Sequence, residues 1–212
     1  FTVWQALLST LLSLLLAIPL ARALHYHATP RVRRLLLTLS LLAFAMPTLV
    51  LITGLILLLG RHGLLSGLLA SVTDAGWTLY GLPGILLAHV YLNLPLAVRI
   101  LSHSLATIPG PAERLASQWR LTTWQRVSRL EWPHCRAALL AATGLIFILC
   151  FNSFSIVLAL GGGPSATTLE VAIYQALKFD FDLDEVLLLS GLQLLIVGAG
   201  LVFLNRGAQT HW

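Results

Sequence analysis

The chain has 212 residues, of which 58% are hydrophobic and only 10% charged, and its formal net charge is +5. Soluble domains carry about 25% charged residues, so this composition excludes an ordinary soluble domain and indicates an integral membrane protein. A positive net charge is compatible with a nucleic-acid ligand. In a membrane protein, however, the placement of the basic residues along the chain carries the information.

Five apolar segments are long enough to cross a bilayer as helices, since a span needs about 20 residues. They lie at about residues 3–24, 35–60, 84–101, 136–160 and 186–204. Backbone polar groups in lipid must be satisfied within the chain. We therefore expect an all-α, polytopic transmembrane helix bundle forming a single domain over residues 1–212, with kinks at Pro47 and Pro95. Because Phe1 already lies in an apolar run, we expect a fragment whose first helix is missing.

Basic and acidic residues fall on opposite sides of these spans. Eleven of the thirteen lysines and arginines lie in or beside residues 25–34, the central loop at 102–135 and the segment after the last span. Six of the eight acids lie on the other side, four of them in residues 180–185. Because basic residues remain cytoplasmic, we expect the central loop in the cytoplasm and the N-terminus outside.

The central loop contains two predicted amphipathic helices. Pro111 suits a first helical position, where its missing N–H costs nothing, and apolar residues follow it at i, i+3, i+4, i+7 spacing. Thr122 and Gln125 form a capping-box pattern that opens the second helix, which we expect Pro133 to end. The aromatic and basic residues of the pair indicate a surface for another protein. The residues assigned to it are Glu113, Arg114, Ala116, Trp119, Arg120, Trp124, Arg126 and Pro133.

The connection at residues 161–185 also contains predicted structure. The run Gly161-Gly162-Gly163-Pro164 breaks the fourth span sharply and forms an outer corner. Thr167 and Glu170 form a second capping-box pattern, and apolar residues recur at helical spacing over residues 169–177. We expect a short amphipathic helix against the outer mouth of the bundle.

Polar residues interrupt the third and fourth spans. Polar side chains at membrane depth usually face the bundle interior or a water-filled path. His89 and Asn93 are four residues apart and share a helix face, and Asn152 and Ser155 lie past the middle of the fourth span. We interpret all four as candidates for a translocation pathway. The alternatives are a polar pair that satisfies neighbouring helices for the first two and close helix packing for the others.

No catalytic constellation is found in the sequence. There is no Gly-rich phosphate loop ending in Lys, so we expect no ATP binding by the chain itself. The histidines lack metal-ligand spacing, and no metal or other cofactor is expected. Cys135 and Cys150 are expected to be reduced core residues. Nucleic-acid binding by the central helix pair is disfavoured by the adjacent membrane spans.

The central loop resembles the cytoplasmic Glu-Ala-Ala loop of permeases from binding-protein-dependent ABC importers. Aligned on Pro133, Ala116 keeps the family pattern and Leu130 replaces Ile. Arg114 takes the position of the family's Glu, and Arg120 takes the position of its Gly. The resemblance implies that residues 102–135 form a coupling loop on which a cytoplasmic ABC ATPase dimer docks.

Further stretches are similar to the thiamine-transport permeases of this family, namely residues 80–90, 131–133 and 151–177. The resemblance covers nearly the whole chain and corresponds to the N-terminal half of a permease with two fused halves. It implies a passive subunit in the bacterial inner membrane, surrounded by lipid, that translocates thiamine. The implied partners are the ATPase dimer, a periplasmic substrate-binding protein and a second permease half. Thiamine is a cation with aromatic rings, so Tyr174 is a candidate for its pathway.

Three alternatives remain open. Ferric-iron permeases share the Gly161–Pro164 corner, so the corner does not fix the substrate. A membrane-embedded scaffold or enzyme and a secondary transporter are alternatives of other classes. A secondary transporter normally places a carboxylate at the membrane midplane, whereas every acid here lies in a loop or at a span end. Co-purification of an ATPase through residues 111–133 would separate these classes.

Overall fold

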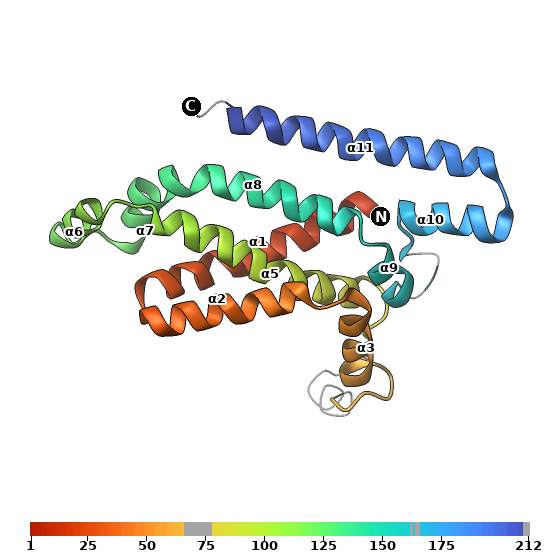
Figure 1. The fold of residues 1–212 in the computed structure, drawn as a ribbon, viewed down its shortest axis with the longest axis horizontal. Helices are drawn as coiled ribbons and strands as arrows, with labels where there is room; N and C mark the ends of the chain where they lie inside the picture. The colour runs from red at the N-terminus through yellow and green to blue at the C-terminus, as the bar shows by residue number, and fades with distance from the viewer. Residues whose placement is uncertain (66–77, 162, 164–165, 210–212) are drawn as a thin grey trace.

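The computed structural model describes residues 1–65, 78–161, 163 and 166–209 (Figure 1). All regular structure in these residues is helical, which confirms the all-α expectation. The helices are α1 (Thr2–Tyr26), α2 (Pro30–Ala45), α3 (Thr48–Leu59), α5 (Leu82–Ala106), α6 (Gly110–Gln118), α7 (Thr123–Arg126), the π-helical turn η1 (Val127–Glu131), α8 (Trp132–Phe151), α9 (Phe154–Leu160), α10 (Leu169–Gln175), the π-helical turn η3 (Ala176–Asp180) and α11 (Leu183–Gln209).

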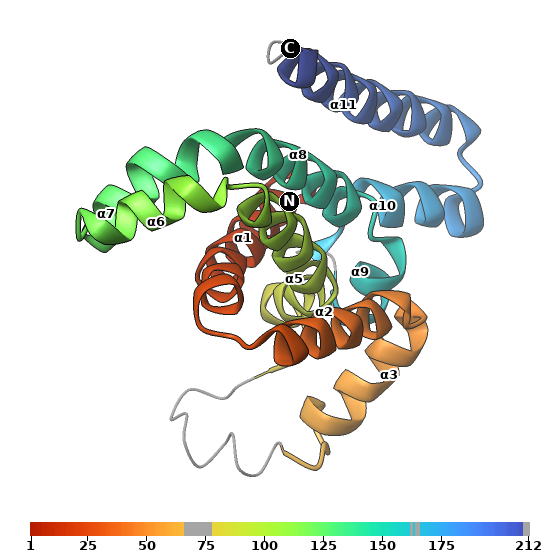
Figure 2. The same cartoon turned by 60° about the vertical axis from the view of Figure 1, so that its left-hand side comes forward.

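Within the described part of the chain, four helices are long and apolar enough to cross a membrane. They are α1, α5, α11 and the continuous helix from Thr123 to Phe151. The shorter α2 runs back beside α5 (Figure 2). The α1–α2 connection, the α6–α7 loop and the C-terminal end of α11 lie at one end of the bundle, whereas α9, α10 and the N-terminus lie at the other (Figure 1). The first end carries the arginine-rich segments, as the charge pattern predicts.

The predicted second span over residues 35–60 is not one helix. α2 ends at Ala45 and α3 begins at Thr48, because Met46 and Pro47 adopt extended ψ angles of 131°. A residue before proline is pushed out of the helical region, so the chain breaks where a kink was expected, and α3 turns away from α2 (Figure 1). The predicted fourth span is similarly divided, between α8 and α9, at Asn152 and Ser153.

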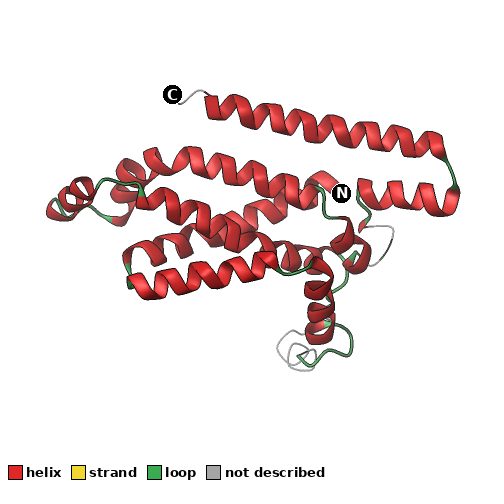
Figure 3. Ribbon diagram, viewed as in Figure 1, coloured by secondary structure: helices red, strands yellow, loops and turns green. Residues whose placement is uncertain are grey.

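Pro133 does not end a helix, contrary to the sequence-based expectation. α7, η1 and α8 follow one another without interruption (Figure 3). In the π-helical turn η1 the N–H of Trp132 bonds to the carbonyl of Val127, five residues back. This wider turn accommodates a proline that lacks an N–H. Pro95 also lies inside a continuous helix, α5.

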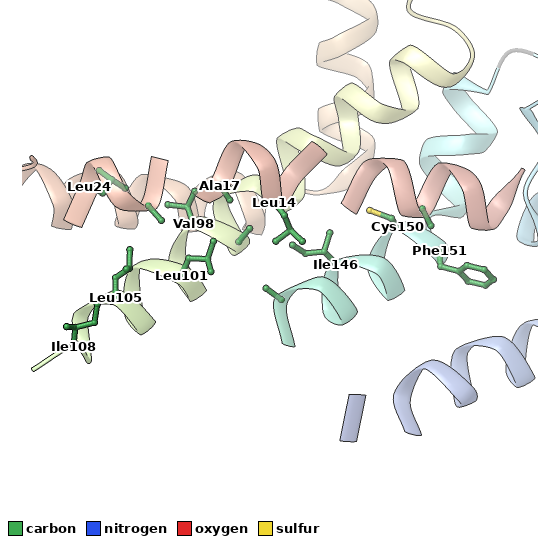
Figure 4. Close-up of a cluster of buried hydrophobic side chains, with 14 residues drawn as sticks. Leu14, Ala17, Leu24, Val98, Leu101, Leu105, Ile108, Ile146, Cys150 and Phe151 are labelled. Atoms are coloured by element: carbon green, nitrogen blue, oxygen red, sulfur yellow. The ribbon is translucent and has the colours of Figure 1, made fainter. Parts of the chain in front are cut away.

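The core lies between α1, α5 and α8 (Figure 4). Ala17 and Ala21 of α1 are fully buried, and Leu14 of the same helix lies near Ile146 of α8. Small residues let transmembrane helices approach closely, which compensates for the weak hydrophobic drive within lipid. Cys135 and Cys150 are both free, as predicted, and Cys150 is fully buried in this core.

Candidate functional site

The loop at the arginine-rich end folds as the sequence predicts up to the start of η1. Pro111 lies in the first turn of α6, and Glu113 adds a negative charge where the helix dipole favours it. Arg120 then adopts the left-handed conformation, with φ 48°, at the position where the resembling family has Gly. Thr122 and Gln125 form the predicted capping box, with hydrogen bonds of 3.0 and 3.3 Å.

Charged side chains attach this loop to the end of α1. The guanidinium of Arg22 donates to both carboxylate oxygens of Glu131, at 2.6 and 3.1 Å. Glu131 is only 4% exposed, so this is a buried, bidentate ion pair. His25 Nε2 lies 2.8 Å from the carboxylate of Glu113 on α6. A cavity of about 520 Å³ is lined by residues at the end of α1, in α6 and α7 and in the turn between the last two.

Arg126 extends this attachment to α7. Its guanidinium carbon lies 5.0 Å above the ring of Tyr26 on α1, within the range of a cation–π interaction. Its Nη2 donates to Ser117 Oγ of α6 at 3.1 Å. Arg126 therefore joins α1, α6 and α7, a role distinct from the outward-facing one that the sequence suggests.

The outer side of the loop exposes large aromatic side chains. Trp119 is 70% exposed and Trp124 is 77% exposed. Arg114 and Arg120 are also exposed, whereas Ala116 is buried and Pro133 is exposed in the first turn of α8. Exposed tryptophan and arginine are the residue types that most often anchor protein interfaces. The loop therefore presents a surface suited to a protein partner.

His89 and Asn93 lie inside the bundle, between α1, α5 and α8. His89 is 1% exposed, and its Nδ1 lies 2.8 Å from Ser9 Oγ of α1. Asn93 Nδ2 donates to the His89 carbonyl at 2.9 Å and approaches Cys150 Sγ of α8 at 3.3 Å. These contacts favour the alternative in which the pair satisfies neighbouring helices. Neither of them lines the cavity at the α6–α7 loop.

Asn152 and Ser155 lie at the opposite end of the bundle, where α8 gives way to α9. Asn152 is exposed, and its Oδ1 accepts a hydrogen bond of 2.9 Å from Gln193 of α11. Gln193 also donates to Glu170 of α10 at 3.1 Å. Burial raises the pKa of Glu170, while the hydrogen bond from Gln193 acts in the opposite direction. Ser155 is half-buried on α9.

Tyr174 projects from α10 into an aromatic group at this same end. Its ring lies 5.3 Å from Phe154 of α9 and 6.2 Å from Phe179, centroid to centroid. The ammonium of Lys178 lies 5.6 Å from the same ring. The ring therefore contacts a cation supplied by the chain itself, and its contact with a transported cation stays a prediction.

The glycine corner is described in part, because Gly162 and Pro164 lie outside the described residues. The N–H of Gly161 bonds to the carbonyl of Val157 at 2.8 Å. A Cβ at Gly161 would lie 2.5 Å from that oxygen, so only glycine fits without displacement. Gly163 has φ 141°, which side-chain-bearing residues rarely adopt.

The predicted capping box at Thr167 and Glu170 is wrong by one residue. α10 begins at Leu169, with Thr168 as its N-cap, and Thr168 makes no side-chain cap bond. Instead, the amide of Leu169 donates to Thr2 Oγ1 of α1 at 3.0 Å. A side chain 167 residues away thus caps this helix, which no local pattern could reveal.

Sequence inspection missed several residues that hold the site together. Gln5, Ser9 and Ser13 recur every four residues on α1, and all three are fully buried. Gln5 donates to the Cys150 carbonyl of α8 at 2.9 Å. This four-residue period of polar groups in an apolar helix was a usable signal. The pairing of Arg22 with Glu131 had no comparable signal.

The apolar helix bundle with its protruding α6–α7 loop has the composition of a polytopic membrane protein. The chain belongs to the family described as "Binding-protein-dependent transport system inner membrane component", whose model matches residues 9–210. It is therefore a multi-pass protein of the inner membrane.

The individual relatives described next are transport permeases. The chain is 46% identical to the thiamine transport system permease protein ThiP of Escherichia coli (strain K12) over 97% of its length. It is 47% identical to ThiP of Haemophilus influenzae over 91% of the present chain. It spans 38% and 36% of those two proteins. A ferric transport system permease protein, FbpB of Actinobacillus pleuropneumoniae, is 29% identical over 65% of the chain.

Two solved structures share the fold. The inward-facing MetNI methionine ABC transporter matches with a TM-score of 0.71 at 16% identity, over 98% of this chain and 93% of that chain. A bacterial ABC transporter that imports the acidic polysaccharide alginate matches with a TM-score of 0.79 at 14% identity, over 99% and 78%. At such low identity these matches establish the fold alone.

Proposed function

We propose that the chain is the membrane-spanning permease part of an ABC importer and that its substrate is thiamine. The observation that carries this proposal is the 46% identity to a thiamine transport permease over 97% of the chain. The chain spans less than two fifths of that relative, so a second permease half is part of the proposal. A periplasmic binding protein and an ATPase dimer complete the proposed assembly.

The α6–α7 surface is the proposed docking site of the ATPase. Its exposed residues Trp119 and Trp124 would fill a groove on the partner. The contacts of Arg22 with Glu131 and of His25 with Glu113 would carry movement of the loop to α1. ATP is then bound and hydrolysed by the partner, and the permease contributes the membrane path.

The opposite end, at α9 and α10, is the proposed entry for substrate. Asn152 and Ser155 lie where the helix breaks, and Tyr174 offers an aromatic face. Glu170 adds a carboxylate to this group. An organic cation is suited by an aromatic ring beside a negative charge. His89 and Asn93 stay candidates for the deeper path only if α1, α5 and α8 separate during transport.

Uptake of labelled thiamine tests this proposal. The complete protein carrying this chain is expressed, with its ATPase and binding protein, in cells that lack their own thiamine permease. Uptake dependent on ATP is expected, and Arg120→Glu in the docking surface should abolish it while membrane insertion persists. Accumulation of ferric iron without thiamine would support the iron permease instead, to which the 29% match points.

A further inference from the structure

A second cavity lies at the arginine-rich end, away from the α6–α7 loop. It has a volume of about 620 Å³ and is formed by the end of α1, the first turns of α2 and the last turns of α5. Three arginines line it, namely Arg33, Arg34 and Arg99, and two histidines, His25 and His103, add further nitrogen atoms. None of its ten lining residues is an acid.

The three arginines of this cavity have no carboxylate partner within the described residues, although His25 on its edge contacts Glu113. Among the described residues, the carboxylate of Glu131 contacts Arg22 and that of Glu113 contacts His25. Neither carboxylate contacts one of the three arginines. Arg33 Nη2 donates to the Ser102 carbonyl at 3.0 Å, while its buried Nε has no partner. The first turn of α2 contains no acid, so its dipole adds to the positive potential. Such a concentration of charge is stabilised by an anion.

The other side of the cavity is apolar. Leu37 and Leu41 line it one and two helical turns further along α2. Their neighbours on α2 are also open, since Leu35 is 59% exposed and Leu42 is 64% exposed. A small soluble anion would make no favourable contact with this row of leucines. A molecule with an anionic head and hydrocarbon chains would use both parts.

We propose that this cavity binds an anionic phospholipid from the leaflet at the arginine-rich end. The headgroup phosphate lies among Arg33, Arg34 and Arg99, and the acyl chains lie along Leu37 and Leu41. Basic pockets between transmembrane helices are suited to anionic headgroups, and each basic residue near the surface contributes to the attraction. The volume of about 620 Å³ accommodates a headgroup. The site is independent of the transported substrate.

Native mass spectrometry of the complete protein in detergent tests the site. Phosphatidylglycerol is added, with phosphatidylcholine of the same chain length as the neutral lipid. Tighter retention of phosphatidylglycerol is expected, and Arg34→Gln with Arg99→Gln should weaken it about thirtyfold. Both side chains are exposed, so this variant should fold. Arg33→Gln provides a second variant.

The matched control is Arg136→Gln, which removes one exposed charge at the same end of the bundle but outside the cavity. It should leave retention nearly unchanged. A loss per removed charge as large in this control as in the double variant would show a diffuse surface attraction and overturn the site. Equal retention of both lipids would do the same. Protection against thermal unfolding by inorganic phosphate alone, as large as that by phosphatidylglycerol, would establish a soluble anion as the ligand and overturn the lipid proposal.

Discussion

The two ends of the bundle are assembled by different interactions. At the arginine-rich end, acidic side chains bridge the elements, as in the ion pair Arg22–Glu131 and the contact between His25 and Glu113. At the other end no ion pair is found among the described residues, and backbone groups also bridge the elements, for example the Gly81 N–H bonded to the Leu160 carbonyl at 2.6 Å. We therefore expect the loss of a charged side chain to destabilise the first end. At the second end we expect added atoms to be destabilising.

Removing Arg22 should have the largest effect on stability. Arg22→Ala leaves the buried carboxylate of Glu131 unpaired, and losing one partner of such a pair costs about 3 kcal/mol. Thermal unfolding of the complete protein in detergent measures this. Arg136→Ala, at an exposed site, is the control. Adding Glu131→Gln should recover part of the loss; no recovery would mean that the pair is not the cause.

Removing the exposed tryptophans should affect binding without affecting folding. Trp119→Ala with Trp124→Ala should weaken ATPase binding about thirtyfold, the loss typical of an interface hot spot. The unfolding temperature should stay constant, since the side chains are 70% and 77% exposed. Trp4→Ala, at a 61% exposed tryptophan of α1 outside the loop, is the control. Unchanged affinity in the double variant would contradict the docking assignment.

Adding one methyl group at the glycine corner tests the other end. Gly161→Ala brings a Cβ to 2.5 Å from the Val157 oxygen, and the required backbone shift should cost about 2 kcal/mol. The control is Gly191→Ala in α11, where a Cβ meets nothing within 4 Å. The unfolding temperature should fall only in the first variant. Similar temperatures for both would show that the corner adapts freely.

Relaxing the turn between α6 and α7 should have the smallest effect. Arg120→Gly removes the cost of a left-handed arginine and should stabilise the loop by about 1 kcal/mol. Hydrogen exchange of residues 110–131 measures this. Arg114→Gly, inside α6, should destabilise the loop by a similar amount. Faster exchange in both variants would show that the turn at Arg120 carries no strain.

Local sequence signals predicted local structure well. Pro111 and the Thr122–Gln125 capping box correctly mark the starts of α6 and α7. Proline was a less reliable signal for the end of a helix, because the effect of its missing N–H depends on the surrounding backbone. The chain breaks beside Pro47, whereas a π-helical turn absorbs Pro133.

Contacts between distant segments could not be predicted in this way. Arg22 and Glu131 are 109 residues apart, and many arginines were available to that carboxylate. Ser9 and His89 are 80 residues apart, and their contact depends on how α1 packs on α5. The candidate surface could therefore be located from the sequence, but its attachment to the bundle could not.

The uninterrupted helix from Thr123 to Phe151 has a mechanical consequence. Its 29 residues extend roughly 43 Å at 1.5 Å per residue, about the full thickness of a bilayer with its headgroups. A rod pivoting near its middle moves its two tips in opposite directions. If the helix moves as one rigid body, we expect a push on Trp124 to displace Asn152, at its other end, in the opposite direction.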